Sequence, residues 1–221
     1  MLAEWSVECA PDDPVLVVPW SSDQSSRQSS DQSSDQSSGP GTSSIAPPAS
    51  HFIDLRENPY DLDHLPEAEQ YPALMHALRA LNAARSPVFT AKCDAWVLDP
   101  EEIEQLRINL DLDLHLAPDD TPSGFASYID LLLRDRPLFL SFHHNEQLLH
   151  RLIRRAAPLD HPHAMLDCVI RPALVDLTGP QEGFAISLYI KALGPDPRTA
   201  NEHWASALDA VVALLRGKDL I

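Results

Sequence analysis

The alternation of apolar and polar positions along the chain predicts three long β-strands. It is clearest over residues 184–192, where every second residue is apolar, and it recurs over residues 88–98 and 165–177. Successive side chains of a strand point to opposite faces, so each of these strands has one apolar and one polar face. The turn-rich residues 178–183 lie between the last two strands and predict a hairpin.

Apolar residues spaced three and four apart predict helices around these strands. Such stripes occur at Leu74, Leu78 and Leu81, and over residues 138–156. A last helix is predicted over residues 199–216, with Thr199 and Glu202 as a capping box at its start. These helices supply the apolar faces that a sheet needs for a second layer.

Two further helices are predicted in the middle of the chain. Asp99, followed by Pro100 and two glutamates, has the pattern of a capped helix start. Ser123 can cap a second helix, and the apolar stripe of that helix would be Phe125, Ile129 and Leu132.

Shorter patterns complete the predicted fold. Residues 5–9 and 15–20 are typical of a first hairpin, residues 52–56 of another strand, and residues 110–116 have a period of two. The whole pattern predicts a two-layer α+β domain, with a mainly antiparallel sheet and helices packed on one face. Such a domain would place three residues in one core: Cys168, Ile186 and Leu208.

A low-complexity tract interrupts the N-terminal part of the chain. Residues 21–38 repeat Ser-Ser-Asp-Gln with one arginine variant, and serine, proline and glycine continue to residue 50. A segment with so little apolar surface cannot offset the entropy lost on ordering. We therefore predict one domain made of residues 1–20 and 51–221, with a disordered Ser/Gln/Asp-rich insertion at residues 21–50.

The charge of the chain is strongly negative and unevenly distributed. The net charge is −17; residues 1–120 hold 22 acidic and 6 basic side chains, and the remainder is nearly balanced. Such an excess repels phosphate backbones, which argues against nucleic-acid binding. It would suit a basic protein partner, although a merely solvated acidic surface has the same composition.

The chain also lacks the patterns expected of a membrane or secreted protein. Its start has no apolar core typical of a signal peptide, and no apolar run approaches membrane-spanning length. Cys9, Cys93 and Cys168 are odd in number and have no metal-binding spacing. We expect them to be buried free thiols in a cytoplasmic protein without membrane contact.

One helix face carries a candidate metal site. His143, Glu146 and His150 share a narrow face of the predicted helix 138–156, and two imidazoles with a carboxylate can bind zinc or iron. The same spacing also fits a semi-exposed Glu–His pair. Asp111, Asp113 and His115 would align on a strand, where they could equally be charges that protect a sheet edge.

The polar face of the predicted sheet is the second candidate site. Its strongest binding residues are Lys92, Asp94, Trp96, Arg171 and Tyr189, and they would be accompanied by Thr90, Asp167, Ser187 and Lys191. Mixed charge with aromatic residues is typical of an interface, but a plain solvent-facing sheet has a similar composition.

These observations favour a non-enzymatic accessory or adaptor protein over an enzyme. The chain shows no nucleophile elbow and no glycine-rich phosphate loop, so no cofactor is expected. Size, acidity and mixed elements are similar to those of small acidic chaperones and immunity proteins, at the level of fold alone. We predict binding of another protein through the acidic surface and the polar sheet face. A homodimer through that face is equally compatible, and a metal-binding protein or metal-dependent enzyme is the alternative.

Overall fold

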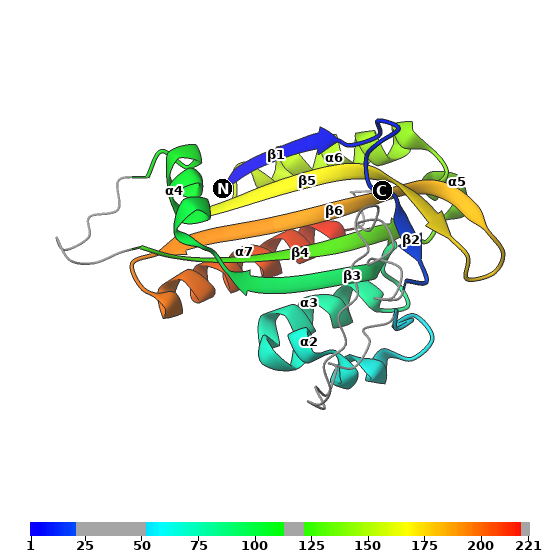
Figure 1. Cartoon of the computed structure of the whole chain (residues 1–221), viewed down its shortest axis with the longest axis horizontal. Helices are drawn as coiled ribbons and strands as arrows, with labels where there is room; N and C mark the ends of the chain where they lie inside the picture. The colour runs from blue at the N-terminus through cyan, green and yellow to red at the C-terminus, as the bar shows by residue number, and fades with distance from the viewer. Residues whose placement is uncertain (21–51, 113–121, 218–221) are drawn as a thin grey trace, which may run out of the picture.

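The computed structural model describes residues 1–20, 52–112 and 122–217, which form a sheet and a layer of helices (Figure 1). The strands are β1 (Leu2–Val7), β2 (Leu16–Val18), β3 (Val88–Val97), β4 (Ser123–Leu133), β5 (Ala164–Val175) and β6 (Gln181–Gly194). The helices are η1 (Pro59–His64), α2 (Pro66–Gln70), α3 (Pro72–Asn82), α4 (Pro100–Asn109), α5 (Arg136–Phe139), α6 (Phe142–Ala156) and α7 (Pro197–Leu215). This confirms the predicted α+β class.

The described strands make one mixed, mostly antiparallel sheet in the order β1-β5-β6-β4-β3. Strands β3, β4, β6 and β5 are antiparallel neighbours, whereas β1 and β2 both run parallel to β5. The predicted N-terminal hairpin is therefore wrong. Leu2 pairs with Met165 and Leu16 with Ala173, so the two short strands follow each other along one edge of β5.

The predicted helix that starts at Ser123 is also wrong, because this segment is β4 in the interior of the sheet. Its neighbours are β3 and β6, and almost all its residues are buried. The supposed helical stripe is divided between faces: Ile129 lies opposite Leu188 on the helix side, while Leu132 has the opposite parity along the strand. Because both faces of this strand are largely buried, its alternation of apolar and polar residues is weak and is easily mistaken for a helical stripe.

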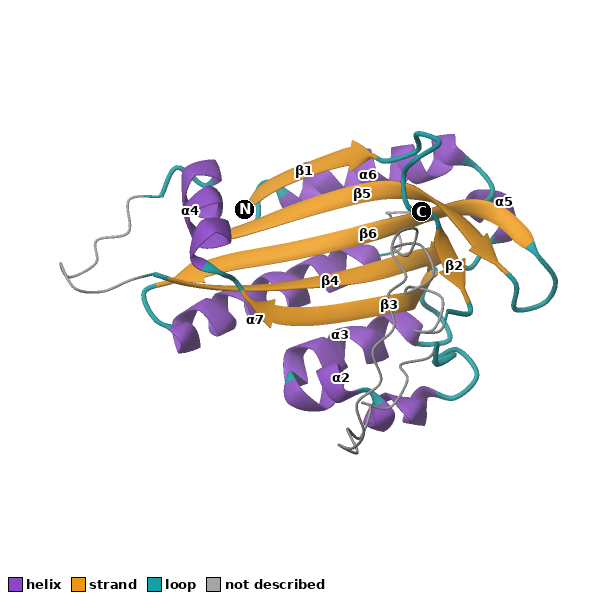
Figure 2. Ribbon diagram, viewed as in Figure 1, coloured by secondary structure: helices purple, strands orange, loops and turns teal. Residues whose placement is uncertain are grey.

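Helices α3, α6 and α7 cover one face of the sheet (Figure 2). Cys168, Ile186 and Leu208 lie in the core between the two layers, as predicted. The indole of Trp204 on α7 is buried there, and its Nε1 donates a hydrogen bond of 2.9 Å to the Ser127 hydroxyl of β4. This bond satisfies both polar groups inside the core.

Three smaller predictions differ from the structure. The α7 cap is Asp196, which accepts hydrogen bonds from the backbone of Arg198 and Thr199, so Thr199 lies inside the helix. Residues 52–56 form a loop and turn, because the Asp54 carboxylate accepts hydrogen bonds from the backbone N–H and the guanidinium group of Arg56. Of the stretch 110–116, the described part ends α4 and enters a turn, with φ of 49° at Asp111. The predicted insertion 21–50 and residues 113–116 lie outside the described residues.

Candidate functional site

The sheet face opposite α3, α6 and α7 is the candidate site, and we call it the open face. The strand register brings together on this face Lys92, Asp94, Trp96, Tyr128, Asp130, Asp167, Arg171, Ser187, Tyr189 and Lys191. Helix α4 lies over one end of this face, where it packs on a small separate core (Figure 1). The middle of the face carries no helix among the residues that the structure describes.

Aromatic rings form a line across the middle of the open face. The Trp96 and Tyr128 ring centroids are 6.3 Å apart, and those of Tyr128 and Tyr189 are 5.9 Å apart. Asp94 and Asp167 flank the two tyrosines in the same cross-strand row. Burial, with the charges of Asp130 and Asp94, raises the pKa of the Tyr128 phenol, so it remains a neutral donor.

A buried carboxyl lies beside this aromatic line. Asp130 is only 4% exposed and accepts a hydrogen bond from the Ser187 hydroxyl, while Lys92 is its neighbour on β3. Burial raises the pKa of Asp130 despite that hydrogen bond and the nearby positive charges. Arg171 donates to the Tyr189 hydroxyl at 3.2 Å and pairs with Glu8 at 3.0 Å. The polar groups are therefore held in fixed positions around the rings.

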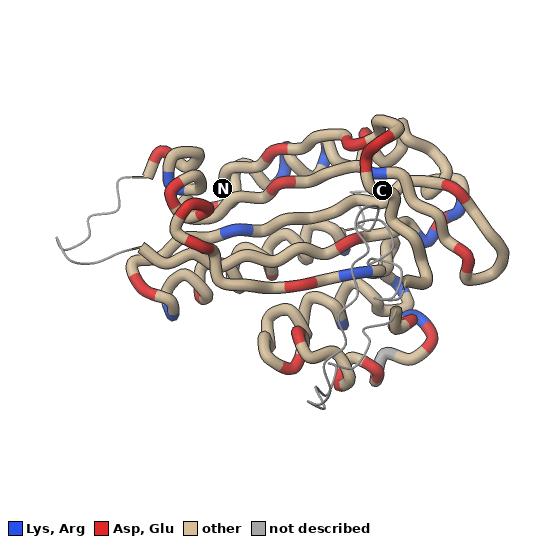
Figure 3. Tube along the Cα trace, in the orientation of Figure 1, with Lys and Arg blue, Asp and Glu red and all other residues tan. Residues whose placement is uncertain are grey.

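An acidic cleft of about 430 Å³ lies at one end of the open face, between α4 and the sheet. Its charged lining consists of Asp99, Glu101, Glu102, Asp167 and Lys191. Four carboxylates against one ammonium group make the cleft anionic, and Figure 3 shows acidic residues gathered around α4. Burial and the nearby Glu4 raise the pKa of Asp167, as expected where carboxylates are close together.

The predicted binding residues Lys92, Asp94, Trp96, Arg171 and Tyr189 all lie on the open face. Thr90 does not, because the register shifts between Thr90 and Lys92. The amide of Asn82 instead donates to the Thr90 hydroxyl in the core. Such a bulge reverses the facing of the residues before it.

Sequence reasoning missed Tyr128 and Asp130 because β4 was taken for a helix. The signal that could have found them is the polar or small character of every second residue at Ala126, Tyr128 and Asp130. Read with period two, this pattern places them beside the polar residues of β3 and β6.

The histidine-rich face of α6 does not assemble a ligand cluster. His143 and Glu146 are 3.5 Å apart, but the His150 ring packs edge-on against Trp5. Within the described residues, no three His, Cys, Asp or Glu side chains are placed to hold a metal ion. Of the second set, Asp113 and His115 lie outside the described residues. Zinc or iron binding therefore stays a prediction without geometric support.

The cysteines are all free, but they differ in burial. Cys168 is buried, Cys93 is half-buried and Cys9 is exposed, so the expectation of three buried thiols is wrong for Cys9. Burial raises the pKa of Cys93 to about 12, which leaves it a protonated thiol. None of the three lies on the open face as defined above.

Comparison with family models, with curated proteins and with solved structures found no match to this chain. Within residues 1–20, 52–112 and 122–217, no helix combines the length and apolar character needed to cross a membrane.

Proposed function

We propose that this protein is a non-enzymatic accessory protein that binds a basic segment of another protein on its open face. The observation that carries the proposal is the one-sided sheet: helices bury one face, and the other displays an aromatic line beside an acidic cleft. A fully solvated face would gain little from three clustered rings, whereas an interface uses such residues as anchors.

The aromatic line supplies apolar contact in a polar surround. Trp96, Tyr128 and Tyr189 are half-buried, so they are supported by the sheet and still present ring surface. Rigid aromatic side chains lose little entropy on binding, and they often dominate interface energetics. The flanking Lys92 and Arg171 offer donors to the partner's backbone carbonyls.

The acidic cleft supplies the charge preference. A Lys or Arg side chain that enters it would face Asp99, Glu101 and Asp167 in a partly desolvated site. The net charge of −17 would also speed encounter with a basic partner, and this steering weakens as salt rises.

The test is quantitative capture of partners by the full-length protein and by Trp96→Ala, with Tyr60→Ala as the matched control. Tyr60 is 83% exposed and lies on η1, away from the open face. Loss of an aromatic anchor should cost at least about 2 kcal/mol, roughly a 30-fold weaker affinity. A Trp96→Ala protein that keeps its fold and every partner would show that the open face is only a solvated surface.

A pair of charge variants tests the basic nature of the partner. Glu101→Gln with Asp167→Asn should weaken binding and flatten its salt dependence, because two carboxylates leave the acidic cleft. Asp63→Asn with Glu69→Gln changes the net charge equally at exposed sites elsewhere and should bind normally. Capture of the chain's own copies alone, with a doubled mass in sedimentation, would instead identify a symmetric homodimer.

A further inference from the structure

A second cleft, with the opposite charge, lies at the other end of the sheet. It has a volume of about 340 Å³ and is lined by residues from the end of β4, the β5–β6 hairpin, the start of β3 and α5. Its charged lining consists of three arginines: Arg56, Arg134 and Arg136. The register separates the two clefts, because Val175 pairs with Gln181 at this end and Ser123 with Gly194 at the other. We call it the arginine cleft.

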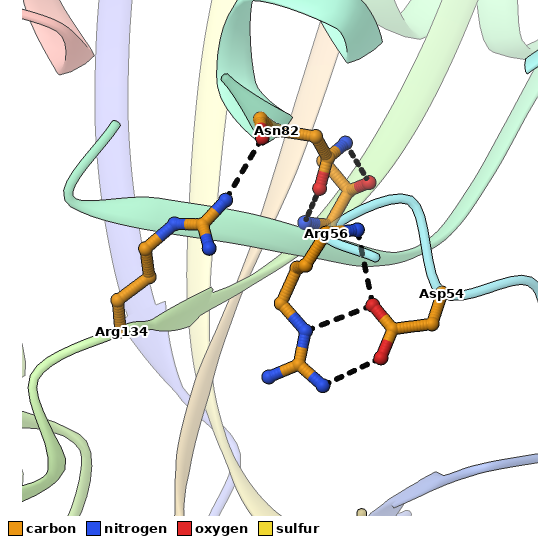
Figure 4. A network of polar contacts seen from close by, with 5 residues as sticks. Asp54, Arg56, Asn82 and Arg134 are labelled. Atoms are coloured by element: carbon orange, nitrogen blue, oxygen red, sulfur yellow. Dashed lines mark hydrogen bonds and ion pairs between the residues drawn. The ribbon is translucent and has the colours of Figure 1, made fainter. Parts of the chain in front are cut away.

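Two of the guanidinium groups are fixed around one ring. The guanidinium carbon of Arg56 lies 4.4 Å from the centroid of the Phe89 ring, and that of Arg134 lies 5.9 Å from it. Arg134 donates to the backbone carbonyl of Asn82 at 2.9 Å (Figure 4). It also donates to the Val88 carbonyl at 3.0 Å, and the two bonds fix its direction. Ordered guanidinium groups bind an anion with less entropy loss than mobile ones.

The positive charge of this cleft is only partly neutralised. Arg56 makes two hydrogen bonds, of 2.8 and 2.6 Å, with Asp54. Among the described residues, no carboxylate forms an ion pair with Arg134 or Arg136. Burial and then the charge of Arg56 lower the pKa of Arg134, which means that the two cations repel each other. The charged lining is thus entirely cationic, with Asp54 and Glu57 acting on Arg56 from outside the lining, in a chain whose net charge is −17.

The remainder of the cleft is apolar with polar groups at its rim. Phe89, Leu133 and Phe139 are buried beneath it, and Thr178 and Gln181 add a hydroxyl and an amide. Apolar walls with a few fixed polar groups, in a volume of this size, are typical of a small-molecule site. The forked donors of arginine match phosphate and carboxylate groups. Arg56 and Arg134 already use Nε and Nη2 in the bonds above, so the donors that would face an anion are those of Arg136 and the remaining terminal N–H groups of the other two.

We propose that the arginine cleft binds a small organic anion, in which a phosphate or carboxylate group is attached to an apolar part. The anionic group would lie between Arg134 and Arg136, and the apolar part would contact Phe89 and Phe139. This site is separate from the acidic cleft, because different strand ends line the two clefts.

The test is titration calorimetry of the full chain with phenyl phosphate, benzoate, inorganic phosphate and the neutral benzyl alcohol. The two aromatic anions should bind saturably with one site per chain. Inorganic phosphate should bind about tenfold more weakly, and benzyl alcohol should not bind, because each lacks one of the two recognised parts. The affinities of benzoate and phenyl phosphate then show whether the cleft prefers a carboxylate or a phosphate group.

Arg136 is the residue to change, because its side chain is exposed and its loss should leave the fold intact. Arg136→Gln should weaken phenyl phosphate binding about tenfold or more, the loss expected for one charge-assisted hydrogen bond, and Arg136→Glu should abolish it. Arg198→Gln is the control, since that arginine is 88% exposed beside the far end of β6. No saturable binding, or equal binding by all three variants at unchanged melting temperature, overturns the proposal.

Discussion

Asp130 is a buried carboxyl on the open face whose surroundings favour the protonated form. Burial is the largest influence and raises its pKa, whereas the Ser187 hydroxyl and the charges of Arg171 and Lys92 act in the opposite direction. When a group binds its proton more tightly in the folded state, the protein becomes less stable as the pH rises from the unfolded pKa of that group to its folded pKa. Ionised Asp130 should therefore lower the free energy of unfolding at neutral pH.

We expect Asp130→Asn to raise the free energy of unfolding at neutral pH. The amide has the same shape, cannot ionise, and its oxygen still accepts from Ser187. The difference from the unmodified protein should disappear as the pH falls below the ordinary value of 3.8, where the carboxyl is protonated in both states. Urea unfolding between neutral pH and the acidic range measures this difference in the free energy of unfolding, with Asp63→Asn at an exposed position as the control. A difference that does not change with pH would attribute the effect to packing.

At the scale of elements, the sequence predicted the three strands that have one clearly polar face and missed the strand that is mostly buried on both faces. The strands at residues 88–98, 165–177 and 184–192 were found as β3, β5 and β6, because their polar residues lie on the open face. β4 lies between two of them and is mostly buried on both sides, so its period of two was weak. The candidate site was found for the same reason: exposed polar residues were visible on three strands, while Tyr128 and Asp130 were lost with β4.

Helix α4 illustrates an element that depends on its own cap. The Asp99 side chain accepts a hydrogen bond of 2.8 Å from the Glu102 backbone N–H, and the Glu102 side chain accepts one from the Asp99 backbone N–H. Its Leu106 packs with Leu98 and Met165 in a small cluster outside the main core. Its stability should therefore be local, unlike that of α7.

We expect Asp99→Ala to destabilise α4 by about 1 kcal/mol and to leave the central strands unchanged. Hydrogen exchange followed by mass spectrometry should show faster exchange over residues 100–109 alone. Ser141→Ala, which removes the cap of α6 on the main core, is the comparison. Unchanged exchange in α4, or a loss of protection spread through β5 and β6, would contradict this local role.

At the scale of the whole molecule, two clefts of opposite charge lie at opposite ends of one sheet. The acidic cleft lies where β4 begins and β6 ends, under α4. The arginine cleft lies where β4 ends and β6 begins, beside α5. Antiparallel strands bring residues that are distant in sequence together at each end of the sheet. The sequence therefore showed an excess of acidic residues, but it could not show that one group of acidic residues and the three arginines line clefts at opposite ends.

The last prediction concerns the tract between Trp20 and Phe52. The Phe52 backbone N–H donates to the Trp20 carbonyl at 2.9 Å, so the chain leaves and re-enters the described structure at adjacent points. The indole of Trp20 also donates to the Ala91 carbonyl on β3 at 2.9 Å, which anchors this junction to the sheet. A short linker can therefore join the two sides without moving either one.

We expect replacement of residues 23–47 by a short Gly-Ser linker to leave the melting temperature unchanged or a few degrees higher. The composition of the tract offers almost no apolar surface, and each halving of a loop relieves only about 0.6 kcal/mol of closure entropy. Calorimetry of the two proteins at equal concentration decides the matter. Trp20→Ala in the shortened protein is the informative control, because it should lower the melting temperature by removing the anchor to β3. A fall of more than a few degrees on shortening alone would mean that the tract itself contributes contacts that its composition does not predict.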